Sequence, residues 1–89
     1  MQKLKTALVT GGGTGIGKAI AAQLAKNGTR VAIASRTLAH VEATASGLNS
    51  VGLDVMAVQM DVRKKQDIEK AVSQIVARWG KIHILVNNA

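Results

Sequence analysis

The sequence contains no cysteine, tyrosine, phenylalanine or proline, and Trp79 is its single aromatic residue. Without cysteine, the chain has no disulfide scaffold, no thiolate nucleophile and no zinc site built on thiolates. With one aromatic side chain, it lacks the stacking platform on which proteins bind single-stranded nucleic acid. The 89 residues are 47% hydrophobic and 19% charged, so there is enough apolar side chain for one small folded domain.

Long apolar runs and acidic residues are also scarce. No uncharged apolar run reaches the roughly 20 residues that cross a bilayer, and the apolar stretch within residues 1–10 is too short for a signal peptide. We therefore expect a cytoplasmic chain with no membrane or nucleic-acid partner. The formal net charge is +7, and the first acidic residue is Glu42. This imbalance predicts that the N-terminal half binds an anion, although a solvated basic surface is the alternative.

Short apolar runs alternate with segments of helical periodicity. The runs at 6–10, 30–35, 55–60 and 82–87 are typical of strands buried in a parallel sheet. Between them, apolar residues recur at helical spacing in three stripes: Ile16, Ile20, Leu24; Leu38, Val41, Ala45, Leu48; and Ile68, Val72, Ile75, Val76, Trp79. Thr37 is a possible N-cap of the second helix, and Trp79 is expected to anchor the core.

This order predicts an α/β fold, in which residues 1–89 form a single β-α-β-α-β-α-β Rossmann-type half-domain. Right-handed crossovers give a parallel sheet, and its strand order is 3-2-1-4 if the third helix crosses to the opposite face. Two helices would then cover one face and one helix the other. The apolar area left bare predicts a missing partner, either further chain or a second copy, and we expect a homo-oligomer.

Glycine is concentrated in residues 10–17, Thr-Gly-Gly-Gly-Thr-Gly-Ile-Gly, between the first strand and the first helix. Glycine costs conformational entropy in ordinary structure, so the cluster indicates a sharp turn and a backbone that a ligand approaches closely. The free N–H groups and positive dipole end of the following helix suit a pyrophosphate.

Three phosphate-binding patterns compete for this loop. The spacing G-x-G-x-x-G fails because Lys18 stands at the third glycine position. A Walker loop is nearly matched by Gly12, Gly17 and Lys18, but Ala19 lacks the hydroxyl that binds Mg²⁺. The pattern T-G-x-x-x-G-x-G fits. A P-loop phosphotransferase therefore remains an alternative.

Together with Asp61-Val62 after the third strand and Asn87-Asn88-Ala89 after the fourth, this loop resembles the short-chain dehydrogenase/reductase family over the whole chain. The resemblance implies that backbone groups of the loop, especially around Ile16, hold the pyrophosphate. It also implies that Asp61 accepts a hydrogen bond from the adenine amino group while the Val62 backbone contacts the ring, and that Asn87 lies near the ribose and helps tie the sheet. The cofactor-binding residues it implies in the loop and the last motif are Gly11, Gly13, Thr14, Gly15, Ile16, Gly17, Asn87 and Ala89.

The end of the second strand bears on the choice of cofactor. A carboxylate there would repel a 2′-phosphate, whereas Arg36 offers a guanidinium fork, with Ser35 and Thr37 as further donors. A charge-assisted contact of about 1.5–3 kcal/mol changes affinity roughly 10- to 150-fold. We therefore predict NADP(H) as the preferred cofactor and NAD(H) as a possible one. Thr14 argues against this preference, because many NADP-dependent members of the family have a basic residue there.

The family's chemistry also requires a tyrosine acid/base with a lysine, a serine and an asparagine. This sequence contains no tyrosine, so we assign no catalytic residue. We assign no metal site either, because His40 and His83 lie far apart, and His83 is expected to pack within the fourth strand. We expect the cofactor half of an oxidoreductase whose carbonyl or alcohol substrate only the complete protein would bind. The alternative is a non-catalytic nucleotide-binding half-domain.

Overall fold

Strands and helices alternate along the part of the chain that the computed structural model describes, residues 4–11 and 15–88. The strands are β1 (Thr6–Thr10), β2 (Arg30–Ser35), β3 (Val55–Gln59) and β4 (Ile84–Asn87), and the helices are α1 (Gly15–Lys26), α2 (Leu38–Asn49) and α3 (Lys65–Trp79). The predicted strand positions are confirmed, except that β3 ends before Met60 and β4 begins at Ile84 rather than at residue 82.

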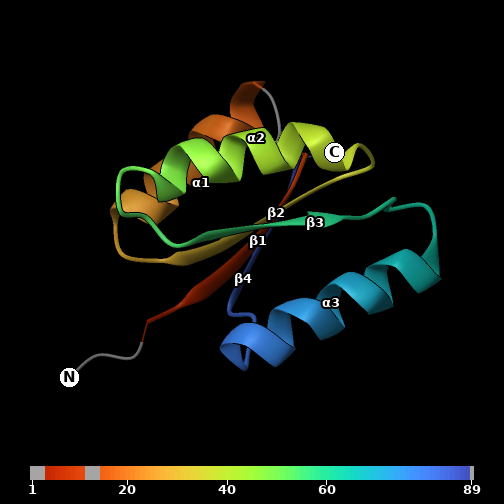
Figure 1. Ribbon diagram of the computed structural model, residues 1–89. Helices are drawn as coiled ribbons and strands as arrows, with labels where there is room; N and C mark the ends of the chain where they lie inside the picture. The colour runs from red at the N-terminus through yellow and green to blue at the C-terminus, as the bar shows by residue number, and fades with distance from the viewer. Residues whose placement is uncertain (1–3, 12–14, 89) are drawn as a thin grey trace.

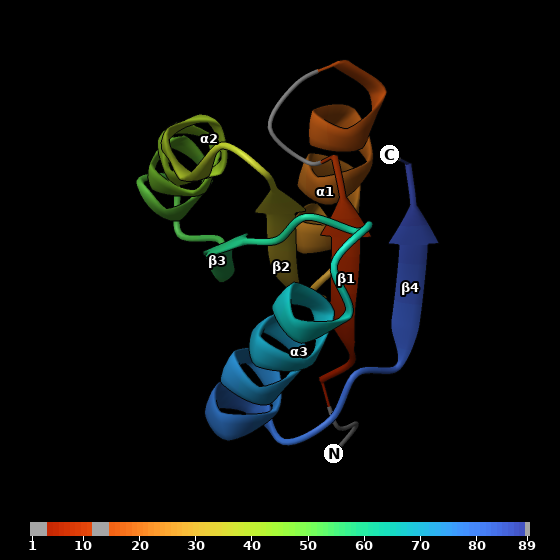
Figure 2. The same cartoon turned by 90° about the vertical axis from the view of Figure 1, so that its right-hand side faces the viewer.

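The strands form one parallel sheet in the order β3-β2-β1-β4 (Figure 2). Helices α1 and α2 cover one face of this sheet and α3 covers the other (Figure 1). The third helix therefore crosses over as predicted, and the Rossmann-type α/β fold is confirmed. The carboxyl ends of β1, β2 and β3 meet at the same edge of the sheet, where such folds bind ligands.

Alternate residues of the central strands enter two separate cores. Val31 and Ile33 of β2 face α1 and α2, whereas Ala32 and Ala34 face α3. On the α3 face β2 thus contributes only small side chains, and the fully buried Ile75 belongs to the same core. Because β2 is buried on both faces, it reads as a continuous apolar run rather than as an alternating one.

The buried faces of two helices differ from the predicted stripes. In α1 the buried residues are Gly17, Ala21 and Ala25, and Ile16 is 71% exposed. In α3 the buried residues are Ala71 and Ile75. Three members of the predicted stripes, Ile16, Ile68 and Val76, are exposed, so the stripes mark the buried helix faces only in part. Small residues therefore form the buried face of α1, whereas the buried face of α3 includes the large side chain of Ile75.

Trp79, the last residue of α3, packs against the core between α3 and the sheet and is only partly buried. The guanidinium carbons of Arg30 and Arg78 lie 5.8 Å and 5.2 Å from the centre of its ring, within cation–π range. Arg78 also pairs with Asp54 at 3.7 Å. The indole therefore combines the predicted core contact with a charged outer edge.

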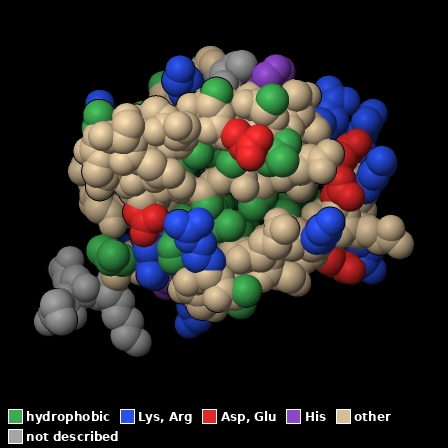
Figure 3. All heavy atoms as spheres, in the orientation of Figure 1, with side chains coloured by type: hydrophobic (Ala, Val, Ile, Leu, Met, Phe, Trp, Pro, Cys, Tyr) green, Lys and Arg blue, Asp and Glu red, His purple; other side chains and the backbone are tan. Residues whose placement is uncertain are grey.

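The face covered by α3 alone retains an open apolar cavity of about 500 Å³ beside β4. Leu85 of β4 is 66% exposed, and β4 lies at one edge of the sheet (Figure 2). Hydrophobic side chains are also visible between the α1–α2 layer and α3 when the molecule is viewed as in Figure 3. The bare apolar area is thus present, and the partner that would cover it stays a prediction.

His83 does not pack within β4 as predicted. It precedes the strand, is exposed, and its Nδ1 accepts a hydrogen bond from the Thr6 backbone N–H at 3.0 Å. Its own N–H donates to the Thr6 carbonyl at 2.9 Å. His83 therefore supplies a side-chain acceptor to the first amide of β1, immediately before the β1–β4 ladder begins.

Candidate functional site

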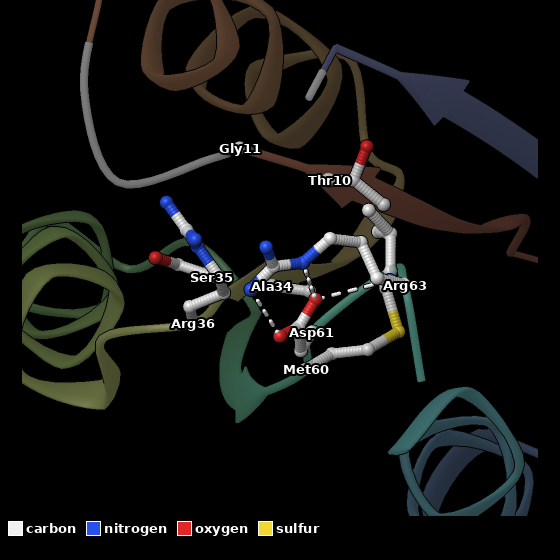
Figure 4. Close-up of a pocket in the computed structure, with 9 residues that line it drawn as sticks. Thr10, Gly11, Ala34, Ser35, Arg36, Met60, Asp61 and Arg63 are labelled. Atoms are coloured by element: carbon white, nitrogen blue, oxygen red, sulfur yellow. Dashed lines mark hydrogen bonds and ion pairs between the residues drawn. The ribbon is translucent and has the colours of Figure 1, made fainter. Parts of the chain in front are cut away.

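A cavity of about 360 Å³ opens where β1, β2 and β3 end (Figure 4). We call it the strand-end cavity. Each of the three strands contributes to it through its last residue or the residues that follow, and its lining is Thr10, Gly11, Ala34, Ser35, Arg36, Met60, Asp61, Val62 and Arg63. Five of these were predicted to bind the cofactor: Gly11, Ser35, Arg36, Asp61 and Val62.

The glycine loop leaves β1 with a left-handed residue. Gly11 has φ +67°, and its N–H donates to the Ala34 carbonyl at 2.8 Å, which ties the loop to the end of β2. Helix α1 then begins at Gly15, whose φ is +56°. Both conformations disfavour a side chain, so these two positions need glycine for their backbone geometry. The first turn of α1 has N–H groups without intrahelical partners, which suit an anion. Gly13 and Thr14 lie outside the described residues.

Gly17 is needed for a different reason. A Cβ built on it would overlap the Gly11 carbonyl oxygen and would lie 2.8 Å from the Asn88 side-chain nitrogen. Glycine at this position therefore allows α1 to pack against the loop and against the end of β4. The exposed Ile16 lies at the start of the same helix, beside the loop.

Arg36 follows β2 and is exposed at the rim of the strand-end cavity. The Ser35 hydroxyl oxygen accepts the Thr37 backbone N–H at 3.1 Å, and its own proton stays available to a ligand. Thr37 is the N-cap of α2, as predicted, but its side chain makes no capping hydrogen bond. Asp61 is the one acidic residue among those that line the cavity.

Asp61 is held by Arg63, two residues further along. Its Oδ1 accepts the backbone N–H and the Nε–H of Arg63, both at 3.0 Å, and its Oδ2 accepts from Nη2 at 2.9 Å. Figure 4 shows the guanidinium edge of Arg63 facing the carboxylate within the cavity. The guanidinium and then the backbone N–H of Arg63 hold the pKa of the Asp61 carboxyl well below its ordinary value, against the effect of burial. Asp61 is therefore a carboxylate at any physiological pH.

Asn87 ends β4 and does not line the strand-end cavity. Its Oδ1 lies 3.1 Å from the hydroxyl of Thr10, its partner in the β1–β4 register, and the Asn88 N–H donates to the same hydroxyl at 3.0 Å. These bonds join the end of β4 to the end of β1. The structure thus places Asn87 in a sheet-tying position, apart from Arg36 and Asp61. Ala89 lies outside the described residues.

Residues that the sequence reasoning did not assign to the site are Thr10, Ala34, Met60 and Arg63. Arg63 was detectable, because an aspartate followed two residues later by arginine at a strand end can form a local turn with a charged pair. Within the described residues, no three His, Asp or Glu side chains gather as a metal site would require. Over the same residues, no helix combines the length and apolarity that crossing a membrane takes.

A family profile described as short chain dehydrogenase matches residues 5–89. The chain belongs to this family. It is 46% identical over 86 residues to the short-chain dehydrogenase/reductase homolog YusS of Bacillus subtilis, covering 96% of this chain and 79% of that one. It is 44% identical over 85 residues to sorbitol dehydrogenase of Cereibacter sphaeroides, covering 96% of this chain and 32% of the relative.

Two solved structures share the fold. A crystal structure of actinorhodin polyketide ketoreductase with NADPH superposes with a TM-score of 0.92 at 38% identity, covering 97% of this chain and 33% of that one. Hydroxysteroid dehydrogenase of Escherichia coli gives a TM-score of 0.93 at 30% identity, covering 96% and 35%. The chain thus spans about a third of these two proteins and of the sorbitol dehydrogenase. Membership in an oxidoreductase family argues against the P-loop phosphotransferase that the loop spacing had left open.

Proposed function

We propose that this chain binds NADP(H) in the strand-end cavity, as the cofactor-binding portion of an oxidoreductase that transfers hydride between nicotinamide and a carbonyl or alcohol substrate. One observation carries the proposal: Arg36 and Asp61 line the same cavity, next to Gly11 and at the carboxyl edge of a parallel sheet. Arg36 would face the 2′-phosphate of a phosphorylated adenosine, and Asp61 would face its adenine amino group.

The described residues suit the dinucleotide in three ways. The N–H groups in the first turn of α1, which have no intrahelical partners, would hold the pyrophosphate. Asp61 would accept a hydrogen bond from the adenine amino group, with the Val62 backbone beside the ring. Asn87 would approach the ribose only from the β4 side, since it lies outside the cavity. The bound nicotinamide supplies the hydride chemistry, and these residues bind and orient the cofactor.

Arg36 would select the phosphorylated cofactor. Its guanidinium lies at the cavity rim, no carboxylate occupies the end of β2, and the Ser35 hydroxyl can add a donor. A 2′-phosphate would gain charge-assisted hydrogen bonds here that a 2′-hydroxyl would not, and such a contact changes affinity roughly 10- to 150-fold. The NADPH in the structurally similar ketoreductase supports this choice.

The test is a titration of the purified protein with NADP⁺ and with NAD⁺, repeated on Arg36→Asp. We expect the protein to prefer NADP⁺ and the variant to prefer NAD⁺. Lys81→Asp is the matched control: it makes the same charge change on an exposed residue of the loop before β4, at the opposite edge of the sheet. If Arg36→Asp and Lys81→Asp lower NADP⁺ affinity equally, overall charge and not a phosphate contact sets the preference.

A second candidate function, nucleotide binding without catalysis, is favoured by one comparison. The chain covers 79% of the YusS homolog, so a relative of little greater length is known. The sequence has no tyrosine to serve as the family's acid/base. The intact mass of the protein isolated from its source, together with a nicotinamide absorbance assay on carbonyl substrates, separates the two functions. The cytoplasmic location and the homo-oligomer stay predictions, and light scattering would test the latter.

A further inference from the structure

The contacts of Asp61 determine how much of its carboxylate remains available to a ligand. Each carboxylate oxygen can accept about two hydrogen bonds. Oδ1 already accepts two, from the backbone N–H and the Nε–H of Arg63, and Oδ2 accepts one, from Nη2. Within the described structure, the acceptor position that remains is therefore on Oδ2.

The two partners differ strongly in exposure. The Asp61 side chain is 11% exposed and the Arg63 side chain 71% exposed. The carboxylate is thus largely buried in the lining of the strand-end cavity, and the guanidinium that it binds lies on the solvent side. The backbone around it is fixed as well, because the Asp61 N–H donates to Asp67 Oδ2 at 3.1 Å and the Asp61 carbonyl accepts the Lys64 N–H at 3.0 Å.

We propose that Arg63 is a positioning residue for base recognition: it fixes the Asp61 carboxylate so that its remaining acceptor position takes an amino group of the bound purine. The inference rests on the proposed function, which it deepens. A base with a 6-amino group donates to Oδ2, whereas a base with a 6-carbonyl brings a second acceptor against a carboxylate. Arg63 thereby confers discrimination between adenine and hypoxanthine that Asp61, free to rotate, would confer less sharply.

An alternative role, binding of the 2′-phosphate beside Arg36, is less well supported by the contacts. Both the Nε and Nη2 positions of Arg63 are directed at Asp61, and the carboxylate compensates its charge. The pair adds only modest stability, because one partner is strongly exposed, so a contribution to folding does not by itself account for it. Its geometry is that of a fork on a carboxylate, which a lysine could not reproduce.

The experiment measures dissociation constants of the purified protein for four probes: NADP⁺, NAD⁺ and their hypoxanthine analogues. The variants are Arg63→Ala, Arg63→Lys and, as the matched control, Lys64→Ala, which removes a neighbouring exposed charge that makes no hydrogen bond to the carboxylate. We expect the unmodified protein to bind the adenine form about tenfold or more tightly than the hypoxanthine form. Arg63→Ala should lose most of this ratio, Arg63→Lys should retain part of it, and Lys64→Ala should keep it.

The ratio of NADP⁺ to NAD⁺ affinity provides the second readout. Both cofactors carry adenine, so we expect Arg63→Ala to leave this ratio unchanged while it lowers both affinities. A selective loss of NADP⁺ affinity would overturn the inference in favour of a phosphate contact. An unchanged adenine-to-hypoxanthine ratio in Arg63→Ala would also overturn it. If the unmodified protein binds none of the four dinucleotides, the proposed function itself fails, a result distinct from the other two.

Discussion

The carbonyl oxygen of Gly11 occupies the space that a Cβ on Gly17 would need. This contact brings the end of β1 against the first turn of α1, and the Asn88 side chain lies on the same spot from β4. The glycine loop therefore has two separate requirements. Gly11 and Gly15 need left-handed backbone, and Gly17 needs the absence of a side chain where three chain segments meet.

The first prediction concerns this junction. Gly17→Ala should lower the free energy of unfolding by about 1–3 kcal/mol, because the backbone must shift to admit the methyl group. Gly47→Ala is the matched control: Gly47 lies inside α2, with nothing within 4 Å of its added Cβ. That change should raise stability by about 0.5–1 kcal/mol, as alanine favours a helix interior. Urea denaturation measures both, and equal effects would contradict the packing argument.

The second prediction concerns the bond between Thr6 and His83. Thr6 is fully buried, so His83→Ala should cost about 1–3 kcal/mol by leaving the Thr6 N–H without its acceptor. His83→Asn, which offers a side-chain oxygen, should recover part of this loss. His40→Ala, on the exposed face of α2, should change the unfolding free energy by less than about 0.5 kcal/mol. Thermal melts of the three variants would refute the assignment if the two alanine variants behaved alike.

The third prediction compares Ile75 and Val76, which are adjacent in the last turns of α3. Ile75 is fully buried and Val76 is 41% exposed. Ile75→Ala should therefore lower the unfolding free energy by about 2–5 kcal/mol, since it removes the side chain that packs on Ala32 and Ala34. Val76→Ala should cost under about 1 kcal/mol. Similar losses at both positions would contradict an α3 orientation that turns Ile75 toward the sheet and Val76 toward solvent.

The fourth prediction is a pH dependence of stability. Because Arg63 holds the pKa of Asp61 well below its ordinary value in the folded protein, this pair stabilises the fold above the unfolded pKa of about 3.9 and ceases to do so as the pH falls through the folded pKa. In Arg63→Ala the folded pKa should rise, although Lys64 and the backbone N–H at 63 still act on the carboxylate. The loss of stability between about pH 4 and pH 2 should thus be shallower in the variant.

Urea midpoints at a series of acidic pH values measure this slope. Lys81→Ala is the control, since it removes one positive charge from the opposite edge of the sheet. A slope that Arg63→Ala and Lys81→Ala change to the same extent would show that net charge, not the Asp61 pair, governs the acid response.

Much of the fold could be read from the sequence because its signals are local. Valine-rich runs indicated the strands, and glycines with φ near +88° follow α1, α2 and α3 at positions 28, 52 and 80. The strand order followed from the handedness of the crossovers together with the assumption that the third helix crosses to the opposite face. Asp61 was assigned through the family resemblance and Arg36 from its position at the end of the second strand, and both line the cavity where the carboxyl ends of the parallel strands converge.

The helix faces were predicted less well. Periodicity found Ile20 and Leu24, which pack partly buried against the core, but it did not find the buried small residues Gly17, Ala21 and Ala25, which have no large apolar side chain to mark them. Ile16, the first member of the α1 stripe, is 71% exposed. Asn87 was expected to lie near the ribose and to help tie the sheet; its contact with Thr10 across the β1–β4 pair agrees with the second expectation, and the ribose contact stays a prediction.

The sequence by itself determined the order of the elements, the glycine turn and the charge at the strand ends, because each depends on residues a few positions apart. Only the tertiary structure decided that the His83 side chain accepts the Thr6 N–H, 77 residues away in sequence. It also decided that Asn88 and Gly11 leave no room for a side chain at Gly17. It likewise decided which oxygen of Asp61 stays open to a ligand. These are contacts between atoms, and their geometry exists only once the strands have been brought side by side.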